Sequence, residues 1–239
     1  MQIEWIPITE ALALFFLAMG LPIVIFRLWE MHHDYVLLFR SRPWIKSWGV
    51  HLMIFAISLL EIWWLSRDKL EKYGLGLGKV NLGWLGLSLA TAIGLFLIIY
   101  LPQIVTRTPI KIDYPVTPTN ALGMMSCEWL FAGLAEELAE RGVLQTYLME
   151  NLDGFIRVFR WDFHVGTILT VVLLGVTQLL LMMLLGEKPR GVLLESIYIM
   201  IFAFFIGYVY QQTNSLIGPI LAHNILRGLG ITLPYILHQ

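Results

Sequence analysis

Residues 121–149 read A-L-G-M-M-S-C-E-W-L-F-A-G-L-A-E-E-L-A-E-R-G-V-L-Q-T-Y-L-M, and the interpretation of the whole chain starts from them. The stretch predicts an apolar helix, yet it carries three carboxylates and a guanidinium within A-E-E-L-A-E-R-G. Ionisable groups at membrane depth are costly, so they are kept mainly where they face a bundle interior and have a partner. Residues four apart share a helix face, which predicts that Glu137 pairs with Arg141 and that Glu136 and Glu140 act together.

The composition is that of a membrane protein. Of the 239 residues, 58% are hydrophobic and 14% are charged, which is far from a soluble average and indicates a polytopic membrane protein. The formal net charge of -1 leaves no basic stripe to neutralise phosphates and argues against nucleic acid as a partner. The single cysteine, Cys127, excludes an internal disulfide.

Apolar runs of about 20 residues predict an all-α fold, a polytopic transmembrane bundle of about seven membrane helices. The predicted spans are residues 5–26, 48–65, 82–105, 121–149, 165–185, 191–210 and 216–237. Two connections mix basic and aromatic residues, as segments at the level of the lipid headgroups do. They are residues 27–46 and 150–161.

A linker with three prolines, residues 106–120, divides the chain into two predicted parts. Residues 1–117 hold the first membrane helices and their interfacial segments, and residues 118–239 form a core of four helices. Polar groups at membrane depth gather in that core. They are Glu128, Glu136, Glu137, Glu140, Arg141, Gln178, His223, Asn224 and Arg227. A glutamate and a histidine on separate helices are able to build a metal site inside a bundle.

These motifs resemble the CPBP family of CAAX-protease and bacteriocin-processing membrane proteins, also called Abi proteins. The resemblance runs from about Pro118 to Ile231. E-E-x-x-x-R is matched by Glu136, Glu137 and Arg141, and the third region by G-Y-V-Y-Q-Q-T-N-S-L-I-G-P-I-L-A-H at residues 207–223. The lead into the second motif is R-W-D-F-H-V-G-T-I-L-T-V-V-L-L-G-V-T-Q at residues 160–178.

The resemblance implies a metal-dependent intramembrane protease of the glutamic type. It assigns Glu136 as the catalytic glutamate, Glu137 and Arg141 as its motif partners, and His223 as the last histidine of the site. In an active enzyme Glu136 and His223 would bind the metal, zinc or another divalent cation.

Three positions depart from the family pattern. Gln178 stands where the second motif has histidine, and Arg227 stands where the third has asparagine. Glutamine is a poor zinc ligand, and arginine has no lone pair to offer. Glu140 replaces an apolar aromatic residue of the family and adds a negative charge. We therefore expect Arg227 to take the metal's place and to form a salt bridge with Glu136 or Glu140.

The altered positions favour a non-proteolytic homologue, a pseudoenzyme that serves as an interaction or assembly subunit of a membrane complex. An active metal-dependent endopeptidase is the alternative, and a transporter subunit is the second alternative. The expected partners are membrane lipid and other membrane protein subunits, with no cofactor. The expected location is the prokaryotic plasma membrane, as a multi-pass protein. Asn224 points about 100° away from His223 and is expected to bond a neighbouring helix.

Overall fold

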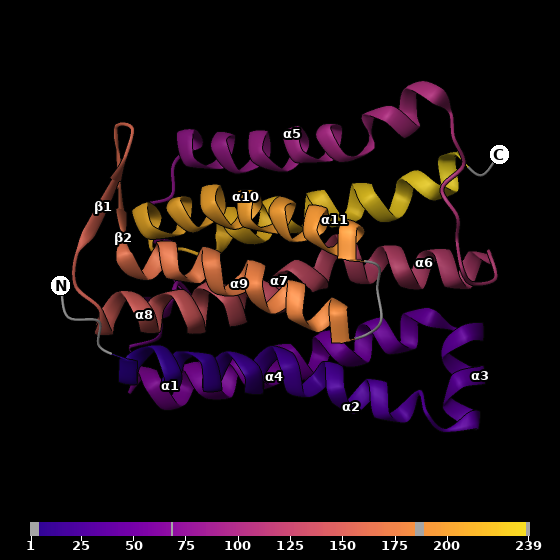
Figure 1. Cartoon of the computed structure of the whole chain (residues 1–239), viewed down its shortest axis with the longest axis horizontal. Helices are drawn as coiled ribbons and strands as arrows, with labels where there is room; N and C mark the ends of the chain where they lie inside the picture. The colour runs from indigo at the N-terminus through magenta and orange to yellow at the C-terminus, as the bar shows by residue number, and fades with distance from the viewer. Residues whose placement is uncertain (1–4, 68, 185–188, 238–239) are drawn as a thin grey trace.

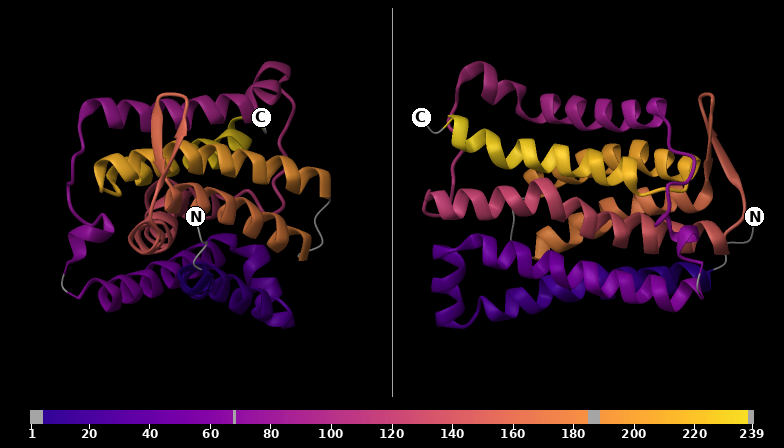
Figure 2. Two further views of the ribbon diagram at one scale, coloured as in Figure 1. Left: turned by 60° about the vertical axis from the view of Figure 1, so that its left-hand side comes forward. Right: turned by 180° about the vertical axis from the view of Figure 1, so that it is seen from behind.

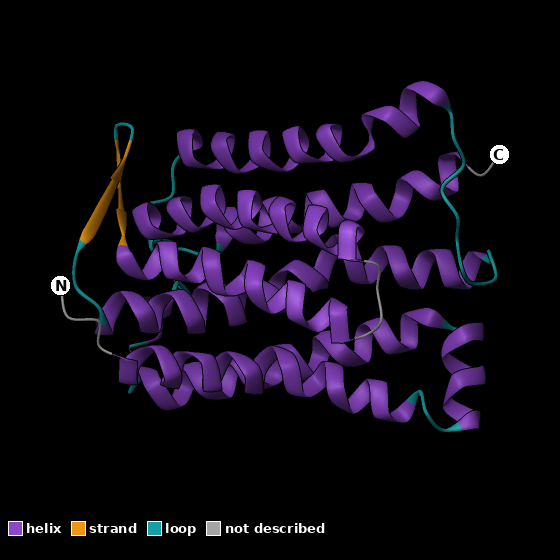
Figure 3. Ribbon diagram, in the orientation of Figure 1, coloured by secondary structure: helices purple, strands orange, loops and turns teal. Residues whose placement is uncertain are grey.

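The computed structural model describes residues 5–67, 69–184 and 189–237, and the chain within them is a bundle of helices with one small hairpin (Figures 1 and 3). The N-terminal part forms the elements α1 (Trp5–Phe15), η1 (Phe16–Gly20), α2 (Leu21–Trp29), α3 (His33–Ser41), α4 (Pro43–Ser66), η2 (Leu70–Tyr73) and α5 (Leu82–Thr106). The α4 and α5 helices end where Arg67 and Arg107 adopt left-handed backbone angles, a common way to terminate a helix.

The motif helix is the continuous helical stretch of residues 118–151, which alternates between α and π winding. Its parts are α6 (Pro118–Ser126), η3 (Cys127–Phe131), α7 (Ala132–Glu137), η4 (Leu138–Gln145) and α8 (Thr146–Asn151). It begins because the Thr117 hydroxyl accepts a hydrogen bond from Asn120 N at 3.2 Å and Pro118 occupies the first turn. π-turns are rare and occur often at functional sites, and here η3 and η4 flank the Glu136–Glu137 pair.

The C-terminal part consists of β1 (Phe155–Val158), β2 (Trp161–His164), α9 (Val165–Leu184), α10 (Pro189–Thr213) and α11 (Ile217–Leu237). The antiparallel hairpin projects from one end of the bundle (Figure 3). The hairpin is a small addition to an otherwise all-α fold, and its first strand falls in the predicted connection of residues 150–161.

Six helical segments of the described residues are long and apolar enough to cross a membrane. They are Trp5–Trp29, Pro43–Ser66, Leu82–Thr106, Val165–Met183, Val192–Thr213 and Ile217–Leu237. The motif helix runs alongside them and completes a bundle of about seven spans (Figures 1 and 2). The chain is therefore an integral, multi-pass membrane protein, as the sequence predicts.

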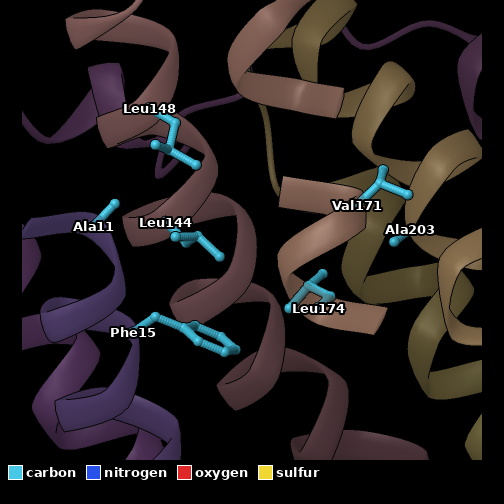
Figure 4. Packing of buried hydrophobic residues seen from close by; sticks show 7 residues of the cluster. All are labelled: Ala11, Phe15, Leu144, Leu148, Val171, Leu174 and Ala203. Carbon is cyan, nitrogen blue, oxygen red and sulfur yellow. The ribbon is translucent and has the colours of Figure 1, made fainter. Parts of the chain in front are cut away.

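The motif helix lies in the middle of the bundle, and both predicted parts of the chain pack on it. Figure 4 shows Ala11 and Phe15 of α1 facing Leu144 and Leu148 of the motif helix. Residues of α9 and α10 complete the same buried cluster. The polar side chains on the buried face of this helix need polar partners, because burial takes them away from water.

Candidate functional site

Three helices bring the polar residues together near the centre of the motif helix. Glu136 and Glu137 lie at the end of α7. His223 and Arg227 are four apart on α11 and so lie on one face of that helix. From the other side, α4 contributes His51.

The carboxylate of Glu136 is the centre of this cluster and is bonded on both oxygens. Arg227 Nη1 donates to Oε1 at 2.7 Å and to Oε2 at 2.9 Å. His51 Nε2 lies 3.0 Å from Oε1, and His223 Nε2 lies 2.9 Å from Oε2. A carboxylate offers about four lone-pair directions. These contacts occupy all of them.

His223 also contacts the second glutamate of the motif, because its Nδ1 lies 2.7 Å from Glu137 Oε1. The other oxygen of Glu137 lies 3.2 Å from Arg141 Nε, and both side chains are completely buried. Arg141 also pairs with Glu140. A chain of alternating charges therefore runs along the motif helix from Glu136 to Glu140.

Arg227 joins a second carboxylate from the preceding π-turn. Its Nε donates to Glu128 Oε2 at 2.5 Å, and Ser47 Oγ on α4 donates to Glu128 Oε1 at 3.1 Å. Ser47 also contacts Cys127, whose Sγ lies 3.7 Å from His51 Nδ1. The side chain of Arg227 is 33% exposed, whereas that of Glu128 is 8% exposed, so the guanidinium covers the carboxylates from the open side.

The comparison with known proteins agrees with the motifs that enclose this cluster. A family model described as Type II CAAX prenyl endopeptidase Rce1-like matches residues 118–228. These residues form an Rce1-like domain. The family resemblance read from the sequence is thereby confirmed, and the family is one of intramembrane proteases. Neither the comparison with curated proteins nor that with solved structures gave a match.

Within the Rce1-like domain, the predicted pairing of Glu137 with Arg141 and of Arg227 with Glu136 is present. The predicted joint action of Glu136 and Glu140 is wrong, since Glu140 pairs with Arg141. The guanidinium of Arg141 binds the carboxylate of its chain neighbour Glu140 as well as that of Glu137, a contact that the rule for residues four apart does not consider.

Gln178, the altered second-motif position, lies on α9 and outside the cluster. Its Nε2 lies 3.3 Å from Glu195 Oε1 on α10. Among the contacts of the described residues, it makes none with Glu136 or His223. The prediction that Gln178 shares a polar site with Glu136 and His223 is therefore wrong.

Asn224 bonds the neighbouring helix, as predicted. Its Oδ1 accepts from Gly133 N at 2.9 Å, and its Nδ2 donates to the Leu130 carbonyl at 3.3 Å. These backbone groups lie on either side of Phe131, whose φ of -121° departs from helical geometry. Gly133 permits the close approach, because a Cβ there would lie 2.4 Å from Asn224 Oδ1.

His51 is the functional-site residue that the family motifs miss. It lies on α4, 85 residues before Glu136, and is 6% exposed. The signal that finds it is an ionisable residue inside an otherwise apolar span, which is a candidate site residue by default.

The residues of this Rce1-like domain do not fit a divalent cation at Glu136. The Arg227 guanidinium bridges both oxygens of the carboxylate that would be the first ligand. It has no lone pair and carries a permanent positive charge, so it repels a dication at that distance. His223, the other expected ligand, has a carboxylate oxygen at each ring nitrogen.

Proposed function

We propose that this chain is a non-proteolytic member of the Rce1-like family, an interaction or assembly subunit of a membrane complex in the prokaryotic plasma membrane. The observation that carries the first half of the proposal is the bonding of Glu136. A general base needs a free lone pair within reach of the water it deprotonates. The lone pairs of the Glu136 carboxylate are instead engaged by Arg227, His51 and His223.

Arg227 is the residue that distinguishes this domain from an active one. Its guanidinium forms a salt bridge with Glu136 and a second salt bridge with Glu128. The cluster thereby becomes a helix-to-helix clamp that joins α4, the motif helix and α11. Paired buried charges need not add net stability, but the loss of one partner is strongly destabilising, so each helix in the clamp depends on the others.

The partner half of the proposal is supported by the hairpin, which lies outside the spanning helices. Phe155 and Phe159 are 66% and 98% exposed, and Phe159 sits at the turn with a left-handed φ of 55°. A bulky residue in that conformation is strained, and strain of this kind gathers at functional positions. Phe159 also lines an apolar groove of about 520 Å³ against Phe204 and Phe205 of α10. We assign this surface to a second membrane protein.

A hydrolysis assay tests the proposal. The full-length protein, purified in detergent and reconstituted in vesicles, is incubated with a farnesylated CAAX peptide and with a transmembrane peptide, with and without zinc. We expect no product above that of Glu136→Gln. Turnover in the wild-type protein that Glu136→Gln abolishes would overturn the proposal.

An active glutamic-type endopeptidase is the second candidate, and one observation favours it. Glu136, Glu137, Arg141 and His223 are all present, and His223 Nε2 lies 2.9 Å from Glu136. On this reading Arg227 leaves Glu136 when substrate binds. The same assay separates the two candidates, because only the endopeptidase gives product that depends on Glu136.

A further inference from the structure

The end of the bundle opposite the hairpin holds a pocket that plays no part in the Glu136 cluster. There α2 ends at Trp29 and α4 begins at Pro43, and the short helix α3 crosses between them at a steep angle to the bundle (Figure 1). Because α2 and α4 belong to the membrane spans, their junction lies where the spanning region ends. The pocket is therefore at the depth of the lipid headgroups.

The pocket has a volume of about 370 Å³. Small-molecule sites begin at about 300 Å³, so it is large enough for a headgroup. Its polar lining consists of Arg27, Glu30, Arg40, Lys46 and Asp113. Its apolar lining consists of Val36, Phe39, Pro43 and Tyr114.

Cations outnumber carboxylates in this lining. Among the described residues, three basic side chains face two acidic ones. Glu30 bonds two of the cations, Arg27 at 3.0 Å and Lys46 at 2.5 Å, and so holds both at the pocket. Asp113 is 75% exposed and lies 2.6 Å from Lys111, which is not part of the lining. Lys111 and water therefore balance much of the charge of Asp113. The pocket therefore carries a positive excess that one anionic group would balance.

The walls of the pocket are held by three partly buried hydrogen bonds. Asn120, which is 2% exposed, donates to the carbonyls of Ser41 and Pro115, both at 2.9 Å, and so ties α3 to the linker. Tyr114 bonds Tyr235 of α11 through their hydroxyls at 2.9 Å. A pocket held at three points by the fold is pre-organised for a ligand.

We propose that this pocket binds the phosphate of an anionic phospholipid headgroup. Lys46, Arg27 and Arg40 supply the charge for the phosphate. Phe39 and Tyr114 supply an aromatic floor for the glycerol and upper acyl carbons. Trp29 and Tyr35 stack at 5.6 Å beside it, as aromatic residues at a membrane interface do. Free phosphate would bind the same basic side chains, but it has no apolar carbons to contact Phe39 and Tyr114.

The test measures the melting temperature of the full-length protein in a neutral detergent during titration with phosphatidylglycerol, phosphatidylcholine or soluble glycerol phosphate. We expect phosphatidylglycerol to raise the melting temperature and the other two to leave it unchanged. Lys46→Gln should lose at least half of that rise. Arg157→Gln, on the hairpin at the other end and 72% exposed, is the matched control and should keep it.

Equal shifts with both phospholipids in the wild-type protein would overturn the proposal, as would an undiminished shift in Lys46→Gln. A full shift with glycerol phosphate alone would overturn the assignment to a lipid, because the site would then be one for a soluble phosphate. Should Lys46→Gln fail to fold, Arg40→Gln carries the same test from the exposed side of the pocket.

Discussion

Arg227 Nη1 lies within 2.9 Å of both carboxylate oxygens of Glu136, at 2.7 Å from one and 2.9 Å from the other. The two residues are 91 positions apart and belong to α11 and the motif helix. Their contact makes Glu136, to which the family resemblance assigns the role of catalytic glutamate, one half of an ion pair. The stability of the bundle should therefore depend on this contact.

Replacing Arg227 with alanine is expected to leave Glu136 and Glu128 without their cation. Breaking a buried pair costs about 3 to 5 kcal/mol, and because Arg227 is partly exposed we expect the lower value, about 3 kcal/mol. Unfolding of the purified protein in detergent measures it. Arg157→Ala, on the exposed hairpin, is the control and should change the free energy of unfolding by less than about 0.5 kcal/mol. Equal stability of the two variants would contradict the pairing.

Gly133→Ala is expected to separate α11 from the motif helix. The added Cβ would lie 2.4 Å from Asn224 Oδ1 and 3.0 Å from the Asn224 backbone nitrogen, so the helices must move apart. The bond between Asn224 and Gly133 N would break, which costs about 1–3 kcal/mol. The measurement is the melting temperature.

The matched control is Gly94→Ala on α5, where an added Cβ meets nothing within 4 Å. Alanine is the better helix former by about 1 kcal/mol, so this variant should be as stable as the wild-type protein or more so. If Gly133→Ala melts no lower than Gly94→Ala, that result would contradict the close contact between Gly133 and Asn224.

Gln178→His restores the family's histidine but should not create a zinc site. The side chain at 178 contacts Glu195 on α10, and among the contacts of the described residues it has none with Glu136. Zinc content of the purified variant, measured by mass spectrometry after dialysis, should equal that of the wild-type protein. Stoichiometric zinc that is lost again in Gln178→His combined with Glu136→Gln would show that the side chain does reach the cluster.

Acid should weaken the junction of α2 and α4 through Glu30. Burial raises the pKa of its carboxyl, but the bonds from Lys46 and Arg27 outweigh burial and hold that pKa below the ordinary value of 4.5. The contribution is therefore complete above pH 4.5 and is lost as pH falls through the folded-state pKa. Glu30→Gln should be less stable than wild type at pH 7 by up to about 1 kcal/mol. That difference should shrink below pH 4.5, and a difference that is constant with pH would count against the pair.

Much of the bundle could be predicted from sequence because each span is a long apolar run, and α5 and α11 differ from their predicted bounds by one residue. The ion pair of Arg227 was predictable too, since Arg227 lies four positions after His223 and so on the same face of the helix. The partner of Glu140 was predicted wrongly, because residue spacing does not show that one guanidinium, that of Arg141, binds two carboxylates. His51 carries no motif, and its contact with Glu136 depends on how α4 packs against the motif helix.

A double-mutant cycle between Arg227 and Glu136 tests the central claim most directly. The free energy of unfolding is measured for wild type, Arg227→Ala, Glu136→Gln and the double variant, so that effects on His51, His223 and Glu128 cancel. A direct contact between the two charges predicts a favourable coupling energy of at least about 1.5 kcal/mol. Single effects that add to within about 0.5 kcal/mol would mean that Arg227 does not bind Glu136, and would contradict the account.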